Sequence, residues 1–220
     1  VVGDFNNWQV SEEYQLKQDG NYFWIELTGL TPQKEYAMQY VVVRSDGVVK
    51  RISDLFSEKV VHSDDQWEPM TVDPTLMPYP QEADGYATVI QTGKPAFQWS
   101  DATLNFKRPN KNNLVIYELW VYDHTQHRSI AGLMDRLQYF EDMGVNAIEL
   151  MPVTEFDGNE NWGYSPNHYF ALDKAYGTPE QMKTFVDECH KRGIAVILDM
   201  VFNHSTGLNP MNKLYPYGDD

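Results

Sequence analysis

The sequence contains little cysteine and little positive charge. A single cysteine, Cys189, occurs among 220 residues, so no disulfide can form within the chain. The 17 Lys and Arg residues are outnumbered by 32 Asp and Glu residues, which gives a formal net charge of -15 at pH 7. Because binding to a nucleic-acid backbone requires clusters of Lys and Arg, this balance disfavours nucleic acid as a partner.

The sequence also lacks a long apolar run, a glycine-rich phosphate loop and a Gly-x-Ser-x-Gly nucleophile motif. Its mean hydropathy is -0.54, and without an apolar segment of about 18 residues we expect no membrane span. The first residues, VVGDFNNW, are typical of a strand and turn rather than a leader. The sequence therefore does not distinguish an extracellular or periplasmic protein from a cytoplasmic one. Aromatic residues are abundant, and the six Trp and 14 Tyr suit stacking on a flat, neutral ligand.

Residues 1–91 predict an all-β region. Four runs rich in β-branched and aromatic residues are separated by Gly, Pro and Asp turn signals; they are Asn21–Thr28, Glu35–Val43, Val48–Ile52 and Tyr86–Ile90. Four prolines make residues 63–85 a loop rather than an element. This spacing favours a small β-sandwich, followed by a connector over residues 92–113.

Residues 114–220 predict an α/β region. Strands are expected at 114–122, 145–151 and 194–201, with helices at 130–143 and 178–192 between them. Thr178-Pro179-Glu180-Gln181 forms a capping box with proline at the first helical position. This alternation predicts a parallel sheet whose faces are covered.

Polar residues gather where the predicted strands end. Asp199, Asn203 and His204 follow the third strand of this region, and the long loop 152–177 after the second carries Trp162-Gly163-Tyr164. Parallel sheets place their sites in the loops beyond the carboxyl ends of the strands. We therefore expect a functional site here, with Trp162 and Tyr164 forming a wall that stacks on sugar. We interpret two further strand acids, Glu118 and Glu149, as partners in structural salt bridges.

Three segments resemble the α-amylase family of glycoside hydrolases. They are LVIYELWVYDHT (114–125), GVNAIELMPVTEF (144–156) and residues 162–205. The last segment contains the family pattern Asp-x-Val-x-Asn-His as Asp199, Val201, Asn203 and His204. The resemblance implies a partial TIM barrel made of the first three βα units. GDFNNWQ (3–9) resembles the immunoglobulin-like β-sandwich of the isoamylase or glycogen-binding type that precedes the barrel in debranching and branching enzymes.

The resemblance also implies roles for individual residues. Tyr164 would stack under the sugar in the subsite before the cleaved bond. His204 would hydrogen-bond that sugar, and Asp199 would orient neighbouring polar groups. Asn203 matches a position that binds a structural calcium in many members, so calcium is the one cofactor considered. The expected partners are α-glucans: starch, glycogen and maltooligosaccharides.

Trp8 matches the first of two tryptophans that form a glycan platform in sugar-binding β-sandwiches. Where the second is expected, residues 47–51 read GVVKR. We therefore consider Trp8 a secondary glycan contact, but favour a packing role for it against the barrel.

Family members cleave with retention, using carboxylates from barrel strands four, five and seven. The predicted elements supply only strands one to three of a barrel that needs about 250 residues. We therefore assign no catalytic residue, and expect an inactive fragment of a retaining α-glucan hydrolase that is prone to self-association. A branching enzyme, a trehalose-releasing enzyme and a non-catalytic glycan-binding or transporter-associated relative remain alternatives. A doubly wound α/β protein is a fourth alternative, which the strand order would decide.

Overall fold

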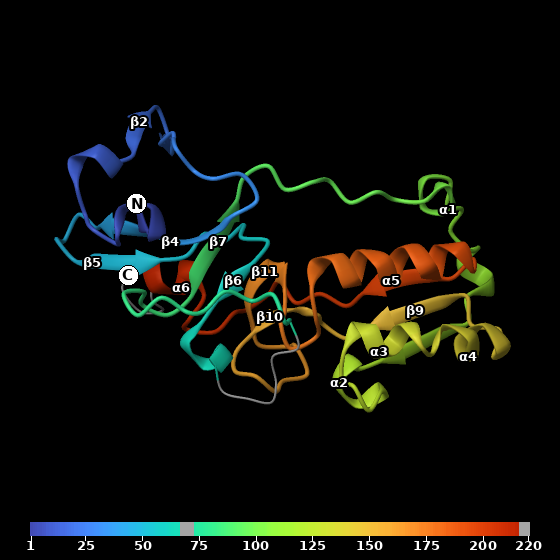
Figure 1. Ribbon diagram of the computed structural model, residues 1–220. Helices are drawn as coiled ribbons and strands as arrows, with labels where there is room; N and C mark the ends of the chain where they lie inside the picture. The colour runs from blue at the N-terminus through green and yellow to red at the C-terminus, as the bar shows by residue number, and fades with distance from the viewer. Residues whose placement is uncertain (67–72, 216–220) are drawn as a thin grey trace.

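The computed structural model describes residues 1–66 and 73–215. Figure 1 shows the N-terminal strands on the left and the parallel sheet with its helices on the right, joined by a long connecting segment. The segment contains one helical turn, α1 (Asp101–Leu104). The hairpin formed by β10 (Thr154–Phe156) and β11 (Pro166–Leu172) lies between the two regions.

One antiparallel sheet dominates the N-terminal region. Its strands are β1 (Val2–Gly3), β4 (Glu35–Val43), β5 (Val49–Ile52), β6 (Val60–Val61) and β7 (Ala87–Gln91). The strand predicted at Glu35–Val43 is confirmed to the residue. Its β-branched and aromatic residues let it pair with β1, β5 and β7.

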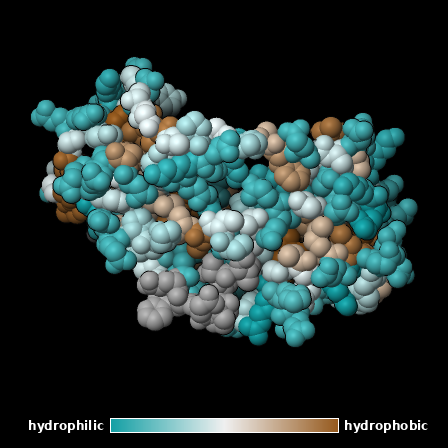
Figure 2. All heavy atoms as spheres, in the orientation of Figure 1, coloured by the Kyte–Doolittle hydropathy of each residue, from teal (hydrophilic) through white to brown (hydrophobic). Residues whose placement is uncertain are grey.

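A separate hairpin pairs β2 (Lys17–Asp19) with β3 (Tyr22–Trp24), and all its residues are exposed. An apolar groove of about 940 Å³ lies between this hairpin and β4. The predicted strands are therefore present in part, but a packed second layer that would complete a sandwich is not established. Figure 2 shows hydrophobic side chains gathered at the end of the molecule where β5 lies, consistent with the exposure of Val43 and Val49.

The C-terminal region contains a parallel sheet of three strands in the order β8–β9–β12. These strands are β8 (Ile116–Leu119), β9 (Ala147–Leu150) and β12 (Ala195–Leu198). Helices α3 (Ile130–Met134) and α4 (Leu137–Asp142) connect the first pair, and α5 (Pro179–Lys191) precedes β12.

The strand order and the helix contacts identify the kind of α/β fold. The strands are consecutive, and α3 packs against α5, so both crossovers cover the same face of the sheet. A doubly wound sheet carries helices on both faces, whereas a barrel carries them all outside. The architecture fits a partial TIM barrel. Its core packs side chains such as Phe140, Ile148 and Phe185 between sheet and helices.

Three predicted boundaries in this region are wrong. The helix expected over 130–143 is broken at Asp135–Arg136 into α3 and α4. The strand expected over 114–122 ends at Leu119, and a helical turn, α2 (Val121–His124), follows. The expected loop 152–177 contains the hairpin β10–β11, whose first strand is fully buried although it contains Glu155. Because Glu155 is polar, the hydrophobicity pattern of the sequence does not indicate a buried strand here.

The remaining elements are short. One further helix, α6 (Pro210–Leu214), contacts β5. The 3-10 turns are Asp4–Asn6, Glu12–Tyr14, Ser63–Gln66 and Lys111–Asn113. Within 63–85, residues 67–72 lie outside the described residues, as do 216–220 at the end of the predicted barrel region. None of the helices in the described ranges is long and apolar enough to cross a membrane.

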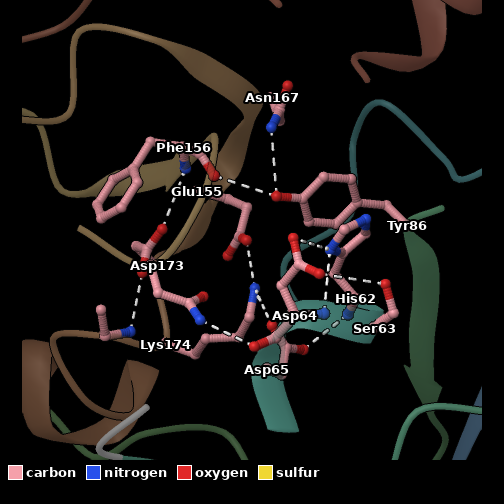
Figure 3. Close-up of polar contacts among 12 residues, drawn as sticks. His62, Ser63, Asp64, Asp65, Tyr86, Glu155, Phe156, Asn167, Asp173 and Lys174 are labelled. Carbon is pink, nitrogen blue, oxygen red and sulfur yellow. Dashed lines mark hydrogen bonds and ion pairs between the residues drawn. The ribbon is translucent and has the colours of Figure 1, made fainter. Parts of the chain in front are cut away.

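A buried polar network joins the β10–β11 hairpin to the N-terminal sheet (Figure 3). The Lys174 ammonium, two residues beyond β11, forms ion pairs with Glu155 of β10 and with Asp65, 3.1 Å away in the N-terminal region. The Tyr86 hydroxyl donates to the Phe156 carbonyl oxygen at 3.1 Å. Removal from water makes unpaired charges costly, so these contacts fix the hairpin against the sheet.

Burial and charge shift the pKa values within this network. Burial raises the pKa of Glu155, and the nearby Lys174 ammonium opposes that effect. Burial alone would lower the pKa of Lys174, but the carboxylates of Glu155, Asp65 and Asp173 raise it. The network therefore keeps the lysine charged.

Candidate functional site

The candidate site lies at the carboxyl ends of β9 and β12. Asp199 directly follows β12, and its backbone N–H donates to the Leu150 carbonyl oxygen at 3.0 Å, which continues the sheet by one bond. The Tyr164 hydroxyl donates to Asp199 Oδ2 at 2.6 Å. The structure thus brings together two site residues that are 35 positions apart in the sequence.

The tyrosine hydroxyl faces negative charge. The hydrogen bond to Asp199 raises the pKa of Tyr164 to about 12, with further contributions from burial and from the charges of Glu118 and Glu149. Glu118 and Glu149 are in register on β8 and β9, so they share one face of the sheet. Three strands therefore each direct one carboxylate toward the same region.

Neither Glu118 nor Glu149 forms an ion pair with another residue in the described parts of the chain, and Glu118 is exposed. The interpretation that these acids form structural salt bridges is not supported. They contribute charge on the sheet face beneath Tyr164 instead.

His204 holds the loop that carries Tyr164. Its Nε2 lies 2.7 Å from the Tyr164 carbonyl oxygen, and because a carbonyl can only accept, Nε2 carries the proton. Nδ1 lies 3.1 Å from Asn203 Oδ1, and the Tyr169 hydroxyl donates to the His204 carbonyl oxygen at 3.2 Å. The imidazole therefore supports the tyrosine backbone, while its expected bond to a sugar remains a prediction.

Gly163 sets the path of the loop. Its φ is +93°, and a Cβ at this position would lie 2.2 Å from the Pro152 carbonyl oxygen. Only glycine combines that backbone angle with so close an approach. Trp162, the residue before it, is 63% exposed, as a stacking surface requires.

Two expected roles fit the structure poorly. Trp8 is only 6% exposed: its ring packs in the core of the N-terminal sheet and its indole N–H donates to Asp4 Oδ1 at 3.0 Å. A buried ring presents no face to a sugar, so the expected glycan contact is not supported. Trp8 packs within its own sheet rather than against the barrel.

The calcium prediction has little support from the residues around Asn203. Its side-chain oxygen lies 3.1 Å from His204 Nδ1, and the side chain is exposed. Across residues 1–66 and 73–215, His, Cys, Asp and Glu side chains form no group of three that could hold a metal ion. Calcium prefers six to eight oxygen ligands, and one amide supplies too few.

Sequence reasoning missed the residues that support this site. Trp120 and Tyr176 join β8 to the loop by a hydrogen bond of 2.9 Å between the indole N–H and the tyrosine hydroxyl. Trp120 stands directly after the strand, where site residues concentrate, and that position was the available signal.

Comparison with known proteins agrees with this geometry. A family model described as "Alpha amylase, catalytic domain" matches residues 102–213, about half of the chain. A malto-oligosyltrehalose trehalohydrolase of Saccharolobus solfataricus is 36% identical over 179 residues, which cover 81% of this chain and 30% of that protein. A 1,4-alpha-glucan branching enzyme of Xanthomonas oryzae pv. oryzae is 30% identical over 221 residues, which cover 93% of this chain and 26% of that enzyme.

Two crystal structures are similar in fold. A protein from Salmonella typhimurium described as a candidate alpha amylase superposes with a TM-score of 0.66 at 27% identity, over 90% of this chain and 30% of its own. A Group B Streptococcus pullulanase in complex with maltotetraose gives 0.58 at 25% identity, over 79% of this chain and 26% of its own. The chain spans less than a third of the length of each of these relatives.

Proposed function

This chain belongs to the α-amylase family, and we propose that it forms the N-terminal part of an enzyme acting on α-glucosidic bonds of starch-type or glycogen-type glucans. In this proposal, residues 114–215 supply the first three βα units of the barrel. They contribute the sugar-binding half of the active site. Residues 1–91 form the β-sandwich of the isoamylase or glycogen-binding type that precedes it.

One observation carries the proposal. The Tyr164 ring is held by a hydrogen bond from its hydroxyl to Asp199 and by the His204 contact to its backbone oxygen. These two contacts fix the ring at the strand ends, where a sugar can stack on its face. A fixed aromatic ring binds with little loss of conformational entropy.

The chain's own residues bind and orient in this proposal, and they do not break the bond. Retaining glycosidases use two carboxyl groups about 5–5.5 Å apart, one as nucleophile and one as acid/base. Asp199 is committed to the Tyr164 hydroxyl. We propose that the reacting carboxylates belong to barrel strands that follow these three in the whole enzyme.

A second candidate reaction is release of trehalose or transfer of a glucan branch. It is favoured by the identity of this chain to a trehalohydrolase and to a branching enzyme. A non-catalytic glycan-binding relative is a further candidate of another class. The reacting groups of the whole protein distinguish these candidates.

Sugar binding by the 220-residue chain tests the proposal. Isothermal titration with maltose and maltotriose is expected to show saturable binding that Tyr164→Ala weakens by about tenfold or more, because aromatic anchors dominate such contacts. Tyr139→Ala, which removes an exposed tyrosine on α4, is the control and should bind as wild type. Equal loss in both variants, or no binding by the wild type, would contradict the proposal.

A turnover assay tests whether the chain lacks the groups that break the glucosidic bond. Hydrolysis of soluble starch by the purified chain is expected to equal a control without enzyme. Measurable release of reducing ends would show that the bond-breaking groups lie within these residues, and would overturn that part of the proposal.

A further inference from the structure

The segment between β12 and α6 that begins with His204, residues 204–209, lies along β11. We call it the β12–α6 segment. The Tyr169 hydroxyl of β11 donates to the His204 carbonyl oxygen at 3.2 Å. Two residues further along the segment, the Thr206 N–H donates to the Pro166 carbonyl oxygen at 3.3 Å. The hairpin strand therefore fixes the segment at its beginning and in its middle.

Asn167 lies where β11, the N-terminal region and the β12–α6 segment meet. Its Nδ2 donates to the Tyr86 hydroxyl at 3.2 Å, as Figure 3 shows. Its Oδ1 accepts from the Thr206 hydroxyl, and its backbone carbonyl oxygen accepts from Asn209 Nδ2 at 2.7 Å. Asn167 and Asn209 are both fully buried. One buried asparagine thus joins the N-terminal region to the segment that carries His204.

The partners of Asn167 fix the orientation of its amide. The Phe156 carbonyl oxygen can only accept, so the Tyr86 hydroxyl donates its proton there and accepts from Asn167. A flipped amide would place Oδ1 against the Tyr86 oxygen with no proton between them. At the other end, the Leu208 N–H donates to Thr206 Oγ1 at 3.2 Å, and the Thr206 hydroxyl donates to Asn167. These groups form one directional chain of hydrogen bonds from the β12–α6 segment to β10.

The N-terminal region also holds the far end of the β12–α6 segment. Asn209 caps α6 by accepting from the Met211 N–H at 2.9 Å. Lys213 of α6 donates to the Asp84 carbonyl oxygen at 3.1 Å, and α6 contacts β5. His204 therefore lies between β12 and a segment whose position depends on the N-terminal region.

We propose that Asn167 is a positioning residue for sugar binding, through which the N-terminal region sets the place of His204 and so of the Tyr164 ring. The proposal rests on the proposed function. His204 Nε2 donates to the Tyr164 carbonyl oxygen at 2.7 Å, so a shift of the segment releases the backbone that carries the ring. Asn167 acts from the interior, through the segment alone. Removing one partner from a buried polar network leaves the other groups unpaired, which favours a rearranged segment.

Because Asn167 is fully buried, the test changes its partners instead. Thr206→Val keeps the shape of the side chain but removes the hydroxyl that donates to Asn167. In isothermal titration of the 220-residue chain, it is expected to lower maltose affinity about threefold to tenfold, the change that loss of one hydrogen bond produces. Thr206→Ser restores the hydroxyl and should bind maltose as wild type does. A serine variant that binds as weakly as the valine variant would overturn the proposal.

Tyr86→Phe tests the connection to the N-terminal region. It keeps the ring but removes the hydroxyl that accepts from Asn167, and should lower maltose affinity in the same way as Thr206→Val. An unchanged affinity would show that the N-terminal region does not act through Asn167.

Asn146→Ala is the matched control, because this amide also joins two backbone segments, at the amino ends of the strands. It accepts from the Val115 N–H at 2.8 Å and donates to the Asn113 carbonyl oxygen at 2.9 Å. The variant should lose stability in urea unfolding while its maltose affinity stays at the wild-type value. An equal loss of affinity in Asn146→Ala would mean that any loss of stability weakens binding, which contradicts a specific role for Asn167.

NMR signals of the His204 imidazole, assigned with His204→Gln, report its position without sugar. They should shift in Thr206→Val and Tyr86→Phe and stay in place in Asn146→Ala. Unchanged signals and unchanged maltose affinity in both variants, with Tyr164→Ala still weakening binding, would overturn the role of Asn167 and leave the proposed function standing. If the wild type binds no maltose, the proposed function is wrong, and the role of Asn167 in sugar binding is wrong with it.

Discussion

Backbone geometry restricts which residue can occupy position 163, and burial determines the protonation of His168. Gly163 has no side chain, and it allows the turn between Trp162 and Tyr164, because a Cβ at this position would lie 2.2 Å from the Pro152 carbonyl oxygen. His168 is fully buried on β11, with Nε2 2.8 Å from the Ser53 hydroxyl and Nδ1 without a hydrogen-bond partner in the described residues.

Gly163→Ala is expected to destabilise the chain by more than about 2 kcal/mol, since it combines a left-handed backbone with a collision against backbone. Gly158→Ala is the matched control: its φ is also positive, +76°, but nothing lies within 4 Å of the added Cβ. It should cost only about 1–2 kcal/mol. Urea unfolding measures both, and equal losses would show that the contact with Pro152 is unimportant.

His168→Gln is expected to change how stability depends on pH. Burial, with smaller effects of Lys174 and His62, lowers the pKa of His168 to about 3. A histidine with a depressed folded pKa contributes stability above its unfolded pKa of about 6.5, and this is lost as pH falls toward 3, by up to roughly 1.4 kcal/mol per pH unit.

Urea unfolding between pH 7 and pH 4 measures that slope. His168→Gln should flatten it, whereas His127→Gln, at an exposed histidine, should follow wild type. Parallel curves for all three proteins would contradict the assignment.

Individual helices and strands form here where local signals and tertiary contacts agree. In α5 the Thr178 side chain accepts from the Gln181 N–H at 3.1 Å, and the Gln181 side chain accepts from the Thr178 N–H at 2.8 Å. The connector is fixed to the same helix by Asp187, which accepts from the Ser100 N–H at 3.0 Å and from the Thr103 hydroxyl at 2.6 Å. Helix α5 therefore holds the connector against the α/β region.

Thr178→Ala is expected to cost about 0.5–2 kcal/mol of unfolding free energy, the usual value of an N-cap. Thr184→Ala, at an exposed position within the same helix, should change it by less than about 0.5 kcal/mol. Thermal unfolding followed by circular dichroism compares the two. A loss at Thr184 as large as that at Thr178 would argue against the cap.

The elements that sequence predicts well are those with complete local signals. The capping box, Pro179 and the glycine stop at Gly193 delimit α5, and β4 is a run of mainly aromatic and β-branched residues. The break at Asp135–Arg136 and the buried strand around Glu155 depend on contacts with distant segments, which no local pattern contains. The resemblance placed Tyr164 and Asp199 at one site but did not predict their hydrogen bond, and Trp120 and Tyr176 become neighbours only through the fold.

At the scale of the whole molecule, the two regions share one buried ionic network. Lys174 stands at its centre, 3.1 Å from Asp65 of the N-terminal region and paired with Glu155 of the hairpin. A buried ion pair adds little net stability compared with apolar packing, but losing one partner leaves an unpaired charge. The network therefore specifies how the regions dock.

Lys174→Met is expected to destabilise the chain by about 3–5 kcal/mol, because Glu155 and Asp65 lose their cation. Adding Glu155→Gln should recover part of this loss, since it removes one uncompensated charge. Lys107→Met, at an exposed lysine of the connector, is the control and should change stability by less than about 0.5 kcal/mol. Urea unfolding of the four proteins measures each value, and an unchanged Lys174→Met would show that the network does not hold the regions together.

Tyr164 lies between the two strands of the β10–β11 hairpin. Ser53 and Tyr86 of the N-terminal region form hydrogen bonds with this same hairpin. A chimaera that exchanges residues 1–91 for those of another family member replaces the partners of the hairpin, and so disturbs the loop that presents the sugar-stacking ring. We therefore expect such a chimaera to keep the position of this loop only where the new N-terminal region reproduces the contacts with His168 and Phe156.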